Sequence, residues 1–144
     1  METVTPPITP HVAILMGTYN GEAYLSEQLD SIERQQHTHW TLHVSDDSPQ
    51  SGTFNILKAY QQRWGEQRLK IYQGKQQGFA TNFMSLVRNG AIQGDYYAFA
   101  DQDDRWYPEK LKRAVAMLAA GNASQPMLYT ARSRLVDEEG KPTG

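Results

Sequence analysis

The sequence YYAFADQDDRWYPEKL, residues 96–111, places three aspartates directly after a run of apolar and aromatic residues. The run DYYAFA (95–100) is short and rich in aromatic side chains, which predicts a β-strand. Pro108 suits the first turn of a following helix, where its missing N–H is not needed. The buried face of that helix would be formed by Leu111, Ala114, Val115 and Leu118. The acids therefore lie between a strand and a helix.

The same alternation of strands and helices extends to both sides of this stretch. Further apolar runs predict strands at residues 11–16, 40–47, 68–73 and 126–136. Helices are predicted along Leu25, Leu29 and Ile32, over 53–64, and over about 80–91. The final residues, DEEGKPTG (137–144), predict a turn. This order of elements predicts the α/β class, with a mostly parallel central sheet.

Composition limits the classes of function. A chain of 144 residues is the size of one ordinary domain. It has 14 Lys and Arg against 16 Asp and Glu, with no dense basic run, so no nucleic-acid partner is expected. There is no cysteine, which excludes disulfides, thiolate metal sites and a cysteine nucleophile.

The amino-terminal segment METVTPPITP (1–10) has no apolar core and does not resemble a signal peptide. We interpret residues 1–10 as a flexible segment and residues 11–144 as the functional domain. No apolar run approaches the roughly 18 residues needed to span a bilayer. A cytoplasmic protein is expected, with peripheral membrane association left open.

Polar residues follow several of the predicted strands. They are Gly17 and Thr18 after the first, Asp46 and Asp47 after the second, and Asp101, Asp103 and Asp104 after the fourth. Parallel sheets bind ligands beyond the carboxyl ends of their strands, so one pocket could use all of these groups. The turn after the first strand, GTYNGEAY (17–24), lacks GxGxxG, and the chain has no GxxxxGK[ST], which disfavours dinucleotide-dependent and P-loop enzymes.

The acids themselves suggest a cation. In an extended segment Asp101 and Asp103 would project to the same side, where two like charges repel unless a cation lies between them. Mg²⁺ and Mn²⁺ prefer oxygen ligands and often bind through one or two carboxylates plus substrate phosphates. The alternative is that the acids only cap the helix near Pro108. The four histidines have no suitable spacing with these acids and are expected to be structural or solvent-facing.

Four motifs occur in one order along the chain: VAILMGTYNGEAYLSEQLDSI (12–32), VSDDS (44–48), GFATNF (78–83) and DQDDRWYPEKL (101–111). In this combination the chain resembles the amino-terminal half of a family 2 glycosyltransferase with the GT-A fold. It looks most like the rhamnosyltransferase-type members. The resemblance covers most of residues 11–136 and implies a Rossmann-like α/β/α sandwich that binds a nucleotide sugar.

The resemblance implies roles for the residues at the strand ends. Gly17, Thr18 and Tyr19 would border the nucleoside. Asp47 would accept a hydrogen bond from the base N–H, for which an ionised carboxylate is suited because it only accepts. Gly78 would lie near the ribose or the diphosphate, as would Asn82.

The resemblance also assigns the acids. Asp101 would lie near the ribose and the metal-bound waters, and Asp103 would bind the metal, Mn or Mg, directly. Asp104 is an extra acid typical of the subgroup. Plainer interpretations remain open for other residues: Thr18 and Asn20 as helix caps, Asp46 as a partner of backbone N–H groups, and Trp106 and Tyr107 as packing anchors.

The implied activity is an inverting transfer of a sugar from a UDP- or dTDP-sugar to a saccharide acceptor, in surface polysaccharide synthesis. Members of this family use a carboxylate base that lies in their second half, so the base is expected beyond Gly144. The acids of the final turn, Asp137, Glu138 and Glu139, are not predicted to be this base. A truncated chain would expose apolar surface and could self-associate. The alternative is a nucleotide-binding or assembly module without transfer activity.

Overall fold

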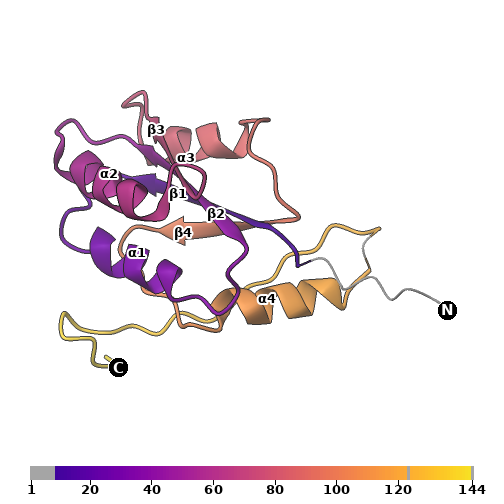
Figure 1. Ribbon diagram of the computed structural model, residues 1–144. Helices are drawn as coiled ribbons and strands as arrows, with labels where there is room; N and C mark the ends of the chain where they lie inside the picture. Colours follow the sequence, from indigo (N-terminus) through magenta and orange to yellow (C-terminus); the bar gives the residue numbers. More distant parts are fainter. Residues whose placement is uncertain (1–8, 123, 144) are drawn as a thin grey trace.

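The centre of the fold is a parallel sheet of four strands in the order β3-β2-β1-β4 (Figure 1). The computed structural model describes residues 9–122 and 124–143. The strands are β1 (Val12–Thr18), β2 (Trp40–Asp46), β3 (Leu69–Gln73) and β4 (Tyr96–Asp101). The helices are α1 (Leu25–Glu33), α2 (Gly52–Trp64), α3 (Phe79–Val87) and α4 (Lys110–Ala119). None of the described helices has both the length and the apolar character required to cross a membrane.

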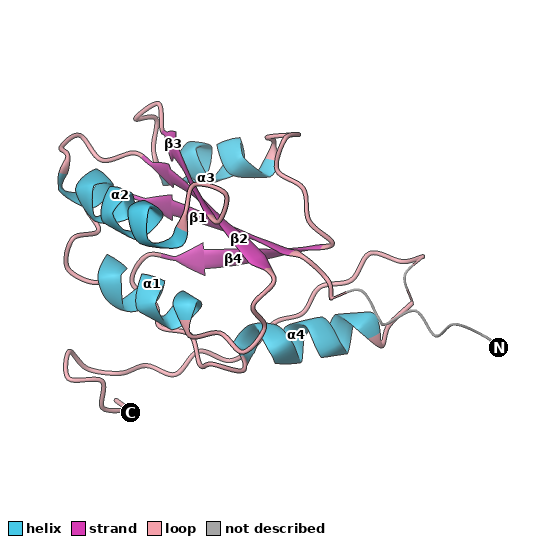
Figure 2. Ribbon diagram, viewed as in Figure 1, coloured by secondary structure: helices cyan, strands magenta, loops and turns pink. Residues whose placement is uncertain are grey.

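Helices cover both faces of the sheet, as Figure 2 shows. On one face the apolar stripes of α1 and α2, including Leu29 and Leu57, pack against Ile14 and Met16 of β1. On the other face, Leu86 of α3 forms a smaller cluster with residues of β1. Every residue of the central strand β1 is buried, as expected of a parallel strand with helices on both faces. The result is the expected three-layer α/β arrangement.

The carboxyl-terminal stretch differs from the prediction. Residues 126–136 were expected to form a fifth strand, but they lie in loop, with one isolated antiparallel bridge between Val136 and Pro142. Leu128 and Leu135 are 83% and 73% exposed. An apolar run forms a strand only where a neighbouring strand supplies hydrogen bonds and side-chain contacts, and this segment has no extended pairing. The predicted turn near Asp137 is present, since Gly140 N–H donates to Asp137 O.

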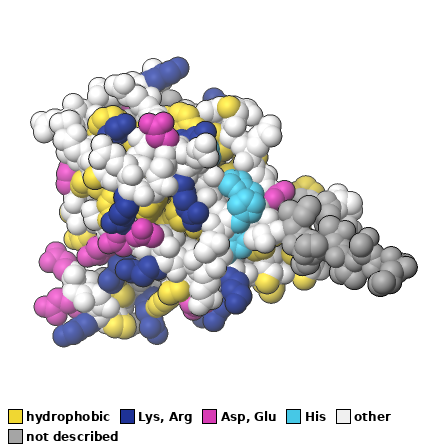
Figure 3. Space-filling view, viewed as in Figure 1, with side chains coloured by type: hydrophobic (Ala, Val, Ile, Leu, Met, Phe, Trp, Pro, Cys, Tyr) yellow, Lys and Arg dark blue, Asp and Glu magenta, His cyan; other side chains and the backbone are white. Residues whose placement is uncertain are grey.

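The histidines are structural. His37 and His39 contact the carbonyl oxygens of Pro10 and Thr9, at 2.9 and 2.8 Å. The ring of His11 packs edge-on against that of His39, and Figure 3 shows histidine side chains gathered on this face. Thr9 and Pro10, at the end of the predicted flexible segment 1–10, are therefore attached to the fold. Residues 1–8 lie outside the described part of the chain.

His43 should make stability depend on pH. It is 5% exposed, and its Nδ1 lies 3.0 Å from the hydroxyl of Tyr72. Burial lowers the pKa of His43 from 6.5 to about 4, with smaller contributions from the positive charges of Lys70 and His11. Between these two pH values the unfolded chain binds a proton that the folded chain does not. The free energy of unfolding should therefore decrease as the pH falls from 6.5 toward 4.

The expected loss is about 2 kcal/mol between pH 7 and pH 5. Urea denaturation at the two pH values measures it. His43→Phe keeps a ring of similar size but cannot titrate, so the variant should lose about 2 kcal/mol less than the parent over the same interval. An equal pH dependence in both proteins would contradict the prediction.

Candidate functional site

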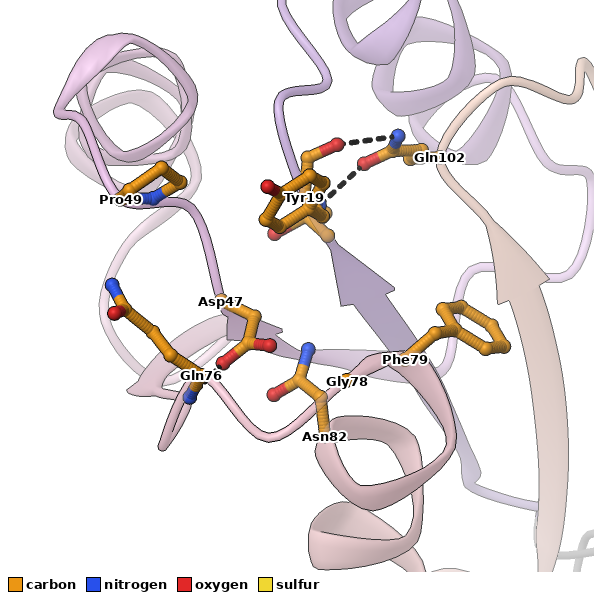
Figure 4. A pocket seen from close by; sticks show the side chains of 9 residues that line it. Tyr19, Asp47, Pro49, Gln76, Gly78, Phe79, Asn82 and Gln102 are labelled. Atoms are coloured by element: carbon orange, nitrogen blue, oxygen red, sulfur yellow. Dashed lines mark hydrogen bonds between the residues drawn. The ribbon is translucent and has the colours of Figure 1, made fainter.

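A cavity of about 590 Å³ lies beyond the carboxyl ends of the strands. Its lining comes from the segments that follow all four strands of the sheet: Thr18, Tyr19, Asp47, Pro49, Gln76, Gly78, Phe79, Asn82 and Gln102. This is the position at which open parallel sheets bind ligands. Figure 4 shows these side chains around the cavity. The expected gathering of polar residues in one pocket is therefore present for part of the predicted set.

The floor of the cavity is polar and fixed. Asp47 is 5% exposed and Asn82 is 4% exposed. Asn82 is held by two hydrogen bonds with Ser45: its Nδ2 donates to the carbonyl oxygen at 2.8 Å, and Ser45 Oγ donates to Asn82 Oδ1 at 2.6 Å. Asp47 Oδ1 accepts the backbone N–H of Gln76. These bonds hold a carboxylate and an amide in defined orientations before any ligand arrives.

The turn that carries Gln76 depends on two glycines. Gly78 has φ +99°, a conformation that favours glycine, and it directly precedes α3. A Cβ on Gly74 would collide with Asp47 Oδ1 and lie 2.6 Å from Asn82 Oδ1. Gly74 therefore gives the two floor residues the space that they occupy, a role that the sequence did not reveal.

The walls of the cavity include two exposed aromatic rings. Tyr19 is 54% exposed and Phe79 is 63% exposed. The backbone of Tyr19 is held by Gln102, whose Oε1 accepts its N–H at 2.9 Å and whose Nε2 donates to its carbonyl oxygen at 3.0 Å (Figure 4). The middle residue of the DQD motif thus ties the loop after β4 to the loop after β1.

The loop after β1 shows whether Asp46, Thr18 and Asn20 have the structural roles that were expected as alternatives to ligand binding. Asp46 Oδ1 accepts the Thr18 hydroxyl and both the N–H and the hydroxyl of Ser48, so Asp46 serves the turn as expected. Neither Thr18 nor Asn20 caps α1, which has Tyr24 at its N-cap and no side-chain cap bond. The capping interpretation of Thr18 and Asn20 is therefore wrong, because the helix begins too far along the chain for either to reach.

The acids form a turn that follows the strand. β4 ends at Asp101, and Gln102 and Asp103 lie in a turn in which Asp104 N–H points to Asp101 O at 3.5 Å. The expectation that strand alternation aligns Asp101 with Asp103 is thus wrong, because the extended backbone stops before Asp103. We call residues 101–104 the acid turn. Its acids do not cap α4, whose N-cap is Glu109 without a side-chain bond.

The charge of the acid turn fits a divalent cation. Burial raises the pKa of the Asp104 carboxyl above its usual range, and the nearby charges of Asp101 and Asp103 raise it further. Lys110 lowers it in part. Among the ion pairs of the described residues, none includes an acid of this turn. Nearby carboxylates without a paired cation suit Mg²⁺ or Mn²⁺, which need only one or two of them when phosphates supply the other oxygens.

The described part of the chain contains no cluster of three or more His, Cys, Asp or Glu residues arranged to hold a metal. Such a metal would therefore depend on oxygens from a ligand as well as on Asp101 and Asp103. Trp106 is buried in the core as a packing anchor, whereas Tyr107 is 60% exposed and is not one.

The predicted site residues divide into three groups. Thr18, Tyr19, Asp47, Gly78 and Asn82 line the cavity. Gly17 is buried beneath it, with Asn82 Nδ2 3.4 Å from the position a Cβ would take. Asp101 and Asp103 do not line the cavity, although Gln102 between them does. Pro49, Gln76, Phe79 and Gln102 were not predicted; of these, Phe79 and Gln102 carried a signal, because they lie within the motifs GFATNF and DQDDRWYPEKL.

Comparison with known proteins identifies the family. The model of the family described as "Glycosyl transferase family 2" matches residues 13–137. The chain belongs to this family. A dTDP-rhamnosyl transferase, RfbG of Shigella flexneri, is 34% identical to it over an alignment of 136 positions, and the alignment covers 89% of this chain and 47% of the relative. The expected similarity to a rhamnosyltransferase is thereby confirmed.

Two solved structures share the fold. The mannosyltransferase PcManGT of Pyrobaculum calidifontis, in complex with GDP-Man and Mn²⁺, superimposes with a TM-score of 0.70 at 24% identity. The likeness covers 79% of this chain and 34% of that one. Residues 1–349 of S. aureus TarS, in complex with UDP-GlcNAc, give a TM-score of 0.62 at 26% identity, over 76% of this chain and 31% of that one. The expected GT-A type of α/β fold is confirmed, and this family 2 chain spans less than half the length of each of these three proteins.

Proposed function

We propose that this chain is the donor-binding part of an inverting glycosyltransferase. It would take a UDP- or dTDP-sugar, use Mn²⁺ or Mg²⁺, and serve transfer to a saccharide acceptor in surface polysaccharide synthesis. The observation that carries the proposal is the cavity at the carboxyl ends of all four strands, with fixed Asp47 and Asn82 at its floor. The family match supports it, as do relatives described as a dTDP-rhamnosyl transferase and as a UDP-GlcNAc complex.

Asp47 is the residue proposed to recognise the base. Its Oδ1 already accepts the Gln76 N–H, which orients the carboxylate at the cavity floor. An ionised carboxylate only accepts hydrogen bonds, so it favours a ring that presents an N–H, as uracil and thymine do. The exposed ring of Tyr19 offers an apolar surface on which such a base can stack.

The acid turn is proposed to hold the metal through Asp103, with Asp101 near the ribose and the metal-bound waters. A bound divalent cation would neutralise the charge that develops on the departing nucleoside diphosphate. The chain's own part is to keep the turn beside the cavity, which Gln102 does through its two hydrogen bonds to Tyr19. Gly78 and Asn82, at the start of α3, would face the ribose or the diphosphate.

Substitution of Asp47 tests the site. Asp47→Asn should weaken binding of UDP and dTDP by about 1.5–3 kcal/mol, the usual contribution of a hydrogen bond to a charged group, with little change in stability. Isothermal titration calorimetry measures the affinity. Asp46→Asn is the matched control, because Asp46 Oδ1 bonds within the turn and asparagine keeps an acceptor oxygen there. Equal affinities for Asp47→Asn and the parent would contradict base recognition.

A second measurement separates a transferase from a binding module. A full-length version of the protein is incubated with UDP- and dTDP-sugars, Mn²⁺ and candidate saccharide acceptors, and release of nucleoside diphosphate is followed. Acceptor-dependent release supports the transferase. Tight nucleotide binding without release under any of these conditions would leave only the binding function.

A further inference from the structure

A stripe of buried polar side chains runs along the side of α1 that faces the acid turn. Gln28, Ser31 and Gln35 are 0%, 2% and 3% exposed. Gln28 and Ser31 lie in α1 beside its apolar stripe, and Gln35 lies just after the end of that helix. The residues around them otherwise form the hydrophobic core. A buried polar group is unfavourable unless it is hydrogen-bonded, so the partners of these side chains indicate what they do.

All three side chains bond the backbone that contains or follows the acid turn. Gln28 Nε2 donates to Asp101 O at 2.8 Å, and Ser31 Oγ accepts the Trp106 N–H at 3.0 Å. The two side chains are themselves joined, because Ser31 Oγ lies 2.7 Å from Gln28 Oε1 as well as 2.7 Å from the Gln28 carbonyl oxygen. This Gln28–Ser31 pair therefore connects the two ends of the segment from Asp101 to Trp106, which contains all three acids.

Gln35 extends the attachment to the start of α4. Its Nε2 donates to Tyr107 O at 2.8 Å, and its Oε1 accepts the Leu111 N–H at 3.0 Å. Gln35 thus holds the segment that follows the acids, whereas Gln28 and Ser31 hold the ends of the segment that contains them. The acids themselves are exposed, so the attachment acts through backbone groups and leaves the carboxylates free.

We propose that Gln28 and Ser31 are positioning residues for the metal–diphosphate site. They fix Asp101 and Trp106, the two ends of the segment that contains the acid turn, so that Asp101 and Asp103 can share one cation with the phosphates without first ordering a loop. Pre-organisation of this kind raises affinity by reducing the entropy lost on binding. The inference rests on the proposed function, because it assigns a metal and a diphosphate to this turn. The competing interpretation is that the bonds only satisfy buried groups and attach α1 to α4.

The test compares nucleotide affinity with and without metal. Gln28→Met keeps the length of the side chain but loses the donor to Asp101 O and the acceptor for Ser31. Ser31→Ala is the smaller change and loses the bond to Trp106 N–H. Affinities for UDP and dTDP are measured by calorimetry in Mn²⁺ and in EDTA. Each variant should reduce the Mn²⁺-dependent gain in affinity by about five- to tenfold, with unchanged affinity in EDTA.

Gln61→Met is the matched control, because Gln61 Nε2 also donates to a backbone carbonyl, that of Leu69, but away from the cavity and the acid turn. It should lower stability without changing the gain from Mn²⁺. A purely structural role of Gln28 and Ser31 predicts the same behaviour for all three variants, and that outcome overturns the inference. If Gln28→Met does not fold, Ser31→Ala decides by the same criterion.

The two proposals fail in different ways. A parent protein that binds UDP and dTDP equally well in Mn²⁺ and in EDTA overturns the metal site of the proposed function, and this inference with it. A parent that gains affinity from Mn²⁺, together with a Ser31→Ala variant that gains as much, overturns the positioning role alone.

Discussion

Asp103→Asn is expected to remove most of the affinity for nucleoside diphosphate that Mn²⁺ provides. Asparagine keeps the shape of the side chain and one acceptor oxygen, but it loses the charge that a hard divalent cation requires. The expected loss in the presence of Mn²⁺ is about 10- to 100-fold for UDP or dTDP, with little change in EDTA. Calorimetric titrations in Mn²⁺ and in EDTA measure it.

The neighbouring acid supplies the control. Asp104 belongs to the same turn and is equally exposed, but the cation is assigned to Asp101 and Asp103 and not to Asp104. Asp104→Asn should therefore reduce the gain from Mn²⁺ less than Asp103→Asn does. If the order of the two variants is reversed, the metal ligand has been assigned to the wrong position in the motif.

Local patterns were sufficient to predict most of the fold. The apolar runs and helical stripes predicted the four strands and four helices of the described chain. This worked because the apolar residues that form each pattern are the same residues that the fold buries. Residues 126–136 show the limit of this reasoning. Their composition favours a strand, but a strand also needs a partner that is distant in sequence, and composition does not reveal that partner.

The site was predicted where motifs occupy strand ends, and missed where distant segments meet. Asp47 and Asn82 were placed near one ligand and do line the same cavity. The alignment of Asp101 with Asp103 was wrong, because the position at which β4 ends is not visible in the acids themselves. Gln28 carried a weak signal, a polar residue next to the apolar stripe of its helix, but its partner lies 73 residues away.

Gly74→Ala is expected to displace both residues of the cavity floor and therefore to lower stability as well as nucleotide affinity. The new methyl group would overlap Asp47 Oδ1 and lie 2.6 Å from Asn82 Oδ1, closer than real contacts allow. Neither neighbour can easily move, because Asn82 has two hydrogen bonds to Ser45 and Asp47 accepts the Gln76 N–H. Overpacking of this kind should lower the free energy of unfolding by about 1–3 kcal/mol.

The same displacement should weaken binding of UDP and dTDP by at least about tenfold at temperatures where the variant is folded, since the proposed base-recognising carboxylate loses its orientation. Gly90→Ala is the matched control, because a Cβ there meets no atom within 4 Å and its φ is not in the left-handed region. Calorimetry and urea denaturation of both variants give the affinity and the stability. Unchanged nucleotide affinity in a destabilised Gly74→Ala protein would show that the orientation of Asp47 does not matter to the ligand, and base recognition would then have to come from other residues of the cavity.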